Sequence, residues 1–156
     1  MISAVSDDDY FVSNAVGPLI GDLDSDNRYG RLTTAGRTAA LLWVMDGRIR
    51  MDGFGGWIET HGQRSEDALE ALRLVGATRF AAAFERALAL IPTRSSDDAD
   101  TRLSAMDAWT PAQAESWRQA EDEYLAINRR DDLVENYLRR FVTSHPEDFP
   151  VSVDDL

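Results

Sequence analysis

The chain has 156 residues and a formal net charge of −12, from 28 Asp and Glu against 16 basic residues that are all Arg. A chain of this length is expected to form one domain that buries roughly 70% of the surface of its unfolded form. The acidic balance disfavours a direct nucleic-acid partner or an anionic membrane, because both require a basic patch. The absence of cysteine excludes disulfides, thiolate nucleophiles and Cys-ligated metal sites.

No apolar run approaches the roughly 20 residues of a membrane span, and the start of the chain lacks the basic and apolar regions of a signal peptide. We therefore expect a cytoplasmic protein without a membrane partner. Its acidic residues are concentrated in two stretches: residues 1–28 hold six Asp against one Arg, and residues 95–123 hold eight acids against two Arg. Such a stretch is either a solvated surface or a phosphate-like surface that attracts a basic partner.

Residues 1–30 form an acidic segment with little periodicity. The apolar residues between Tyr10 and Leu23 predict a helix that begins near Asp7, and Gly17 and Pro18 predict a kink or a division into two short helices. Asp22, Asp24 and Asp26 have the first spacings of a calcium loop, but the glycine and the bidentate glutamate that such a loop needs are missing. We expect no metal site and no cofactor.

A broad apolar face predicts a helix from Thr33 or Thr34 to about Met51. A glycine-aromatic turn follows, and we interpret it as structural, with its aromatic side chains folded inward; it consists of Gly53, Phe54, Gly55, Gly56 and Trp57. Neither a preceding strand nor a following Lys is present to make it a phosphate-binding loop.

Two amphipathic helices come next. Ser65 and Thr78 are the predicted N-caps, and Gly76 is predicted to end the first helix in a left-handed conformation. Because the linker between the two helices is so short, their apolar stripes must be buried against each other or a shared neighbour. The predicted core consists of Leu72, Val75, Phe80, Phe84, Leu88 and Leu138.

The second half of the chain begins with an acidic connector over residues 93–108. Thr110, Pro111 and Gln113 then predict a capped helix that extends to about Asn128. A last helix is predicted from Asp132 to about His145. No segment shows the alternation of a strand, so the predicted fold class is all-α, a single compact multi-helix domain over residues 1–156.

Few residues are suited to catalysis. His145 lies at a predicted helix end, where a capping role is expected, and only His61 with nearby Glu59 resembles an acid–base pair. No serine has the setting of a nucleophile, and paired-His metal spacings are missing. We therefore expect no catalytic residue, and an enzyme that uses His61 and Glu59 remains an alternative.

The segment 41–149 resembles a bacterial helical domain family of mostly unknown function that is typified by a DNA-mimic protein. The resemblance rests on DGFGGW, ALEALRLVGA and ALALIP in order, with weaker matches at DEYL, YLRRFV and HPEDF. Where the family has Asn-Gly-Gly-Phe followed by Gln, this chain has Asp52-Gly53-Phe54, which predicts a shorter turn. The resemblance implies an all-helical fold and no known catalysis, and it allows a homodimer. One member acts by imitating DNA toward a DNA-binding protein.

The sequence thus favours a non-enzymatic protein-binding module that engages a basic protein, of which a DNA-binding regulator is one example. The predicted partner-binding residues are the carboxylates of the connector and of the helix after it: Asp97, Asp98, Asp100, Glu121, Asp122 and Glu123. Arg118 is expected to offset Glu115 on that helix. An immunity-type protein that neutralises a basic nuclease toxin is an alternative from another functional class, and a toxin gene next to that of this protein would favour it.

Overall fold

The structure of the protein is a computed structural model that describes residues 7–149, with side chains described from Phe11 onward. Every regular element in that range is helical, which confirms the predicted all-α class. The elements are α1 (Asp7–Ile20), η1 (Gly21–Asp24), α2 (Asp26–Tyr29), α3 (Thr34–His61), η2 (Gly62–Arg64), α4 (Ser65–Leu74), α5 (Thr78–Leu88), α6 (Ala99–Ser104), η3 (Ala105–Ala108), α7 (Pro111–Arg130), η4 (Val134–Leu138) and α8 (Arg139–Ser144). Within the described part of the chain, no helix is long and apolar enough to cross a membrane.

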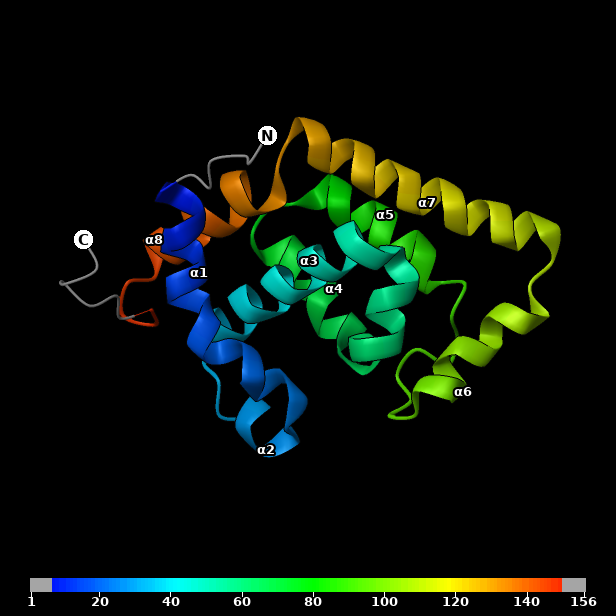
Figure 1. Ribbon diagram of the computed structural model, residues 1–156, viewed down its shortest axis with the longest axis horizontal. Coiled ribbons are helices and arrows are strands. Elements are labelled where there is room, and N and C mark those ends of the chain that lie inside the picture. Colours follow the sequence, from blue (N-terminus) through cyan, green and yellow to red (C-terminus); the bar gives the residue numbers. More distant parts are fainter. Residues whose placement is uncertain (1–6, 150–156) are drawn as a thin grey trace.

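The 28-residue helix α3 is the centre of the fold. It contacts α1, α4 and α6, while α7 lies along α5. Figure 1 shows α7 along the upper edge of the molecule, α1 and α8 at the left, and α6 at the lower right. The helices share one hydrophobic core. Different helices pack near the two ends of α3, on opposite sides of that core.

The predicted apolar stripes are buried in this core. Leu72, Phe80, Phe84, Leu88 and Leu138 are each at most 2% exposed, which confirms five of the six predicted core residues. Val75 is only partly buried, because α4 ends at Leu74 and the chain turns away at Gly76. Gly76 has a φ of 80°, and its amide and that of Ala77 bond back to the carbonyls of Arg73 and Leu72, as in a Schellman motif.

Three of the predicted helix caps form and two do not. Asp132 accepts a hydrogen bond from the Glu135 amide at 2.9 Å. Thr33 accepts a bond from the Gly36 amide at 3.0 Å, and Thr110 forms a reciprocal capping box with Gln113. Ser65 was predicted as an N-cap, but its hydroxyl accepts a hydrogen bond from Trp57 Nε1 at 2.9 Å, because η2 leads directly into α4. Thr78 is already inside α5, which begins after Ala77 without a side-chain cap.

Helix α1 differs from the prediction as well. A kink or two short helices was expected at Gly17 and Pro18, yet α1 continues through both residues to Ile20. Pro18 lies in the last turn, so its missing N–H removes only one intrahelical bond near the end of the helix. Val12 and Val16 are buried in the core, and α1 packs against α3.

The glycine-aromatic segment is a break inside α3. Gly53 has φ 70° and ψ −171°, a combination that is essentially restricted to glycine. Gly55 and Gly56 are helical, so the turn is narrower than the five residues predicted. After the break, Phe54 and Trp57 point into the core, and both are at most 1% exposed.

The break exposes the amide of Phe54, and Glu121 on α7 satisfies it. The Phe54 amide donates to Glu121 Oε1 at 3.1 Å. The Phe54 ring packs edge-on against Trp117 and Tyr124, with ring centroids 5.6 Å away in both cases. A Cβ at position 53 would overlap the Glu121 carboxylate. Position 53 therefore requires glycine both for its φ and for the space that Glu121 occupies.

A buried polar network also ties α3 to α7. The Asp46 side chain is 3% exposed and accepts hydrogen bonds from Tyr124 Oη at 2.9 Å and Asn128 Nδ2 at 2.7 Å. Arg50 Nε lies 2.9 Å from its other oxygen. Burial raises the pKa of Asp46, and Arg50 opposes that shift. Because every partner is satisfied, the network fixes how α7 lies on α3.

Alanine substitutions at Gly53 and Gly55 should show which of these two glycines the backbone break requires. We predict that Gly53→Ala lowers the free energy of unfolding by at least about 2 kcal/mol, from backbone strain and displacement of Glu121. Gly55→Ala should raise it by about 0.5 to 1 kcal/mol, because residue 55 is helical and a Cβ there meets no atom within 4 Å. Urea unfolding measures both. Equal effects of the two substitutions would contradict the assignment of the break to Gly53.

Candidate functional site

The predicted partner-binding carboxylates lie on two separate parts of the molecule. Asp97, Asp98 and Asp100 are exposed on the connector and α6, at the lower right of Figure 1. Glu121, Asp122 and Glu123 lie in the middle of α7, along the upper edge. The structure therefore does not bring the two sets together into one surface.

The acids on α7 have three different environments. Glu121 is partly buried and bonded to the Phe54 amide, and burial raises the pKa of its carboxyl group. Glu123 forms an ion pair with Arg86 of α5. Asp122 is exposed and has no hydrogen-bond or ion-pair partner among the described residues. Glu115 forms the expected ion pair with Arg118. Most of the acidic charge on α7 is therefore engaged within the molecule.

The connector is anchored by Arg102, which is 2% exposed. Its guanidinium donates to the carbonyls of Ile58 at 2.6 Å, Glu59 at 2.7 Å and Ser96 at 2.6 Å. Gly62 leaves the room for this contact, since a Cβ there would lie 2.6 Å from Arg102 Cδ. The arginine thus fastens the connector to the last turns of α3. In the sequence, Arg102 is only one of two basic residues among the eight acids of residues 95–123. No local pattern marks its side chain as buried.

Asp98 has a structural role on the connector in addition to its charge. It caps α6 by accepting hydrogen bonds from the Thr101 hydroxyl at 2.6 Å and the Thr101 amide at 2.9 Å. These bonds lower the pKa of Asp98, so the carboxylate stays ionised. A charge reversal at Asp98 would remove the cap and destabilise α6, which makes Asp97 and Asp100 the better positions for testing charge alone.

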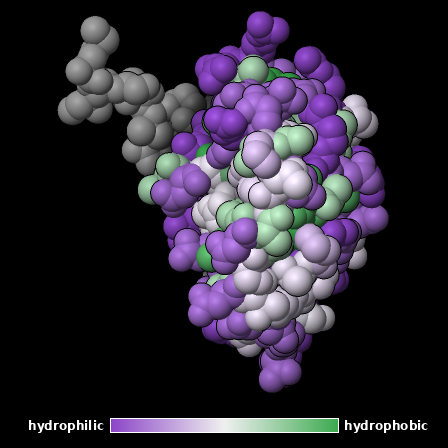
Figure 2. Space-filling model, turned by 90° about the vertical axis from the view of Figure 1, so that its right-hand side faces the viewer, coloured by the Kyte–Doolittle hydropathy of each residue, from purple (hydrophilic) through white to green (hydrophobic). Residues whose placement is uncertain are grey.

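We use the name α6 end for one end of the molecule, which consists of the last turn of α3, the connector, α6 and η3. Two further exposed carboxylates belong to it, Glu59 on α3 and Asp107 on η3. Partly buried apolar side chains lie on the same elements or directly after η3: Leu103, Ala105, Met106 and Trp109. Figure 2 views the molecule from this end, and apolar residues gather in the middle of the face with hydrophilic residues around them.

This composition is suited to binding another protein. An apolar centre inside a polar rim is the usual anatomy of a protein–protein interface. None of Asp97, Asp100 and Asp107 has an ion-pair partner among the described residues. The rim at the α6 end is therefore negatively charged and uncompensated except by the buried Arg102 beneath it.

His61 pairs with Asp24 rather than with Glu59. Its Nε2 lies 3.2 Å from Asp24 Oδ1, and its Nδ1 lies 3.0 Å from the Thr60 hydroxyl. The ring stacks on Trp57 with centroids 5.6 Å apart. Both ring nitrogens thus have partners within the molecule, whereas Glu59 is exposed. The pair suggested by the sequence does not form.

The carboxylates with calcium-like spacing each face a different basic group. Asp22 lies near Arg28, Asp24 near His61, and Asp26 near Arg64. Between residues 7 and 149, no three His, Asp or Glu side chains converge in a way that could hold a metal ion. The pairs of Asp24 and Asp26 therefore hold η1 and α2 against the end of α3 and against η2, while the pair of Asp22 with Arg28 links η1 to α2.

Comparison with known families supports the resemblance seen in the sequence. A family model described as DMP19-like protein matches residues 30–142. The chain belongs to the DMP19-like protein family. The matched range begins before residue 41 and ends before residue 149, the bounds of the segment expected from the sequence. It includes all elements from α3 to η4 and the break at Gly53. Neither a comparison with curated proteins nor one with solved structures gives a match.

The partly buried position of His61 gives this family member a measurable pH response, which Asp24 reduces. Burial lowers the pKa of His61 below its usual value of about 6.5, while Asp24 opposes the shift. A lowered folded-state pKa contributes stability that is present above the unfolded pKa and lost as pH falls through the folded one. We predict that His61 titrates below about 6.5 by NMR, and that Asp24→Asn lowers its pKa further. An unchanged His61 pKa in Asp24→Asn would contradict the pairing.

Proposed function

We propose that this DMP19-like protein is a non-enzymatic, cytoplasmic protein-binding module whose α6 end engages a basic protein of the DNA-binding class. The observation that carries the proposal is the group of exposed carboxylates around an apolar centre at that end. Family membership supports the proposal, because the family that the sequence resembles includes one member that acts as a DNA mimic. The carboxylates of this surface carry negative charge, as DNA phosphates do, so a phosphate-binding surface of Arg and Lys would be attracted to it.

Fixed geometry favours this role for the α6 end. Arg102 holds the connector through three carbonyls, so Asp97 and Asp100 are carried by a segment that is fastened to α3. A fixed group of charges loses less conformational entropy on binding than a mobile acidic loop would. The apolar side chains between the charges add contact area that excludes water once a partner is bound.

A non-enzymatic role is part of the proposal. His61 is engaged by Asp24 and Thr60, and the buried Asp46 is engaged by Tyr124, Asn128 and Arg50. Both titratable groups therefore stabilise the fold in the arrangement described. Neither is left with the free nitrogen or oxygen that a general base needs.

Charge neutralisation at the α6 end should weaken partner capture. We predict that the double variant Asp97→Asn/Asp100→Asn captures at least about tenfold less of a basic DNA-binding protein from a lysate of the source organism at low salt. The matched control Glu115→Gln/Asp122→Asn changes the net charge equally on α7 and should retain capture. Both variants should unfold at the wild-type denaturant concentration, because exposed charges contribute little to stability.

The captured protein decides between the related functions. If it is a DNA-binding regulator, adding this protein should release it from DNA, and the competition should weaken as salt rises. A captured nuclease would instead assign the immunity-type role. Capture that survives molar salt, or that is lost equally in both double variants, would contradict the proposed surface.

A further inference from the structure

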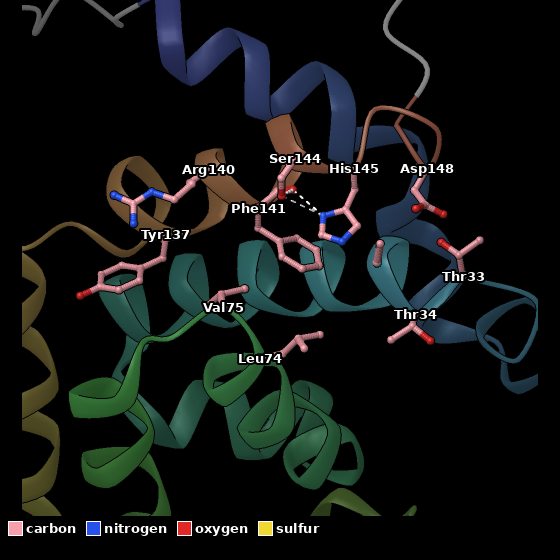
Figure 3. Close-up of a pocket in the computed structure, with 11 residues that line it drawn as sticks. Thr33, Thr34, Leu74, Val75, Tyr137, Arg140, Phe141, Ser144, His145 and Asp148 are labelled. Atoms are coloured by element: carbon pink, nitrogen blue, oxygen red, sulfur yellow. Dashed lines mark hydrogen bonds between the residues drawn. The ribbon is translucent and has the colours of Figure 1, made fainter.

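A cavity of about 620 Å³ lies at the opposite side of the molecule from the α6 end, between the first turn of α3, the end of α4 and α8. Figure 3 shows its lining side chains, which come from these three helices and their adjoining residues, from Tyr137 on η4 and from the segment after α8. A cavity of a few hundred to a thousand Å³ is the size that holds a small organic molecule. It does not overlap the surface proposed above.

The middle of the cavity is apolar. Leu74, Val75 and Phe141 form its walls, and Figure 3 shows all three side chains in the space between α4 and α8. Leu74 is 57% exposed, one of the largest exposures of any large apolar side chain in the described chain. An apolar wall that is open to water gains free energy when an apolar group covers it.

The Arg and Asp side chains that line the cavity lie at opposite ends of it. Arg140 lies at one end and Asp148 at the other in Figure 3. Arg140 is exposed and has no carboxylate partner among the described residues, although the chain as a whole is strongly acidic. The guanidinium is therefore available to a carboxylate, for which its planar donors are well suited.

His145 adds an oriented imidazole to the apolar wall. Its Nδ1 lies 2.8 Å from the carbonyl oxygen of Phe141 and 3.0 Å from the Ser144 hydroxyl. Because a carbonyl can only accept, the contact with Phe141 favours the neutral tautomer that carries its proton on Nδ1. Nε2 then remains as an acceptor on the ring edge that lines the cavity. The ring packs on Phe141 with centroids 4.3 Å apart, which fixes its plane.

From this arrangement we propose that the cavity is a binding site for a small organic carboxylate with an apolar, aromatic-sized body. The ligand carboxylate binds Arg140, and the body lies between Leu74, Val75 and Phe141. A hydrogen-bond donor at the far end of such a ligand meets Asp148 or His145 Nε2. The first turn of α3 lines the cavity at the Asp148 end, across from Arg140 (Figure 3).

An NMR titration with 4-phenylbutyrate tests this site on the intact chain. Saturable shifts are expected at the amides of Leu74, Val75 and Phe141. The neutral amide and the primary amine with the same phenylbutyl body should each bind at least about tenfold more weakly, because only the carboxylate bonds to Arg140. Arg140→Gln should weaken 4-phenylbutyrate binding by about tenfold, the effect of one charge-assisted hydrogen bond at an accessible site.

Arg130→Gln is the matched control, because Arg130 is exposed at the end of α7 and does not line the cavity. It should leave binding unchanged. The proposal is overturned if no saturable shift occurs up to about 10 mM probe, if the amide or the amine binds as well as the carboxylate, or if Arg140→Gln binds like the wild type. It is also overturned if the Leu74 signal shifts with protein concentration alone, because a second copy of the chain would then cover the cavity.

Discussion

The hydrogen bond between the Glu121 carboxylate and the Phe54 amide holds α3 and α7 in one arrangement. The backbone of α3 breaks at Gly53, so its second half starts with an amide that has no carbonyl partner in the first half. Glu121 supplies that partner, and the break turns Phe54 and Trp57 into the core. The second half then ends against the connector, where Arg102 is bonded to its last carbonyls.

This constraint sorts the acidic residues of the chain by role. Glu121 stabilises the fold, Glu123 and Glu115 pair with arginines, and the exposed carboxylates at the α6 end form no ion pair among the described residues. In an acidic protein, pairing part of the negative charge with arginines reduces the repulsion between like charges that destabilises the folded state. Net charge alone therefore overstates the acidic surface that is available for binding. The position of that surface depends on which carboxylates are already paired within the molecule.

Much of the fold follows from local sequence signals. The stripe from Phe80 to Ile91, the left-handed Gly76 and the Thr110 capping box all form as their patterns predict, because each depends on residues close in sequence. Long-range contacts could not be predicted in this way. The roles of Glu121, Arg102 and Ser65 depend on residues 67, 44 and 8 positions away, respectively. The separation of the connector acids from those on α7 has the same origin.

Hydrogen exchange at the Phe54 amide tests the central interaction most directly. We predict strong protection of this amide in the wild type. In Glu121→Ala it should exchange at least about tenfold faster relative to the amide of Leu42 in the first half of α3, because a bond to a charged acceptor is lost. Asp122→Ala should leave the ratio unchanged. An unchanged ratio in Glu121→Ala, or equal effects of both substitutions, would contradict the account.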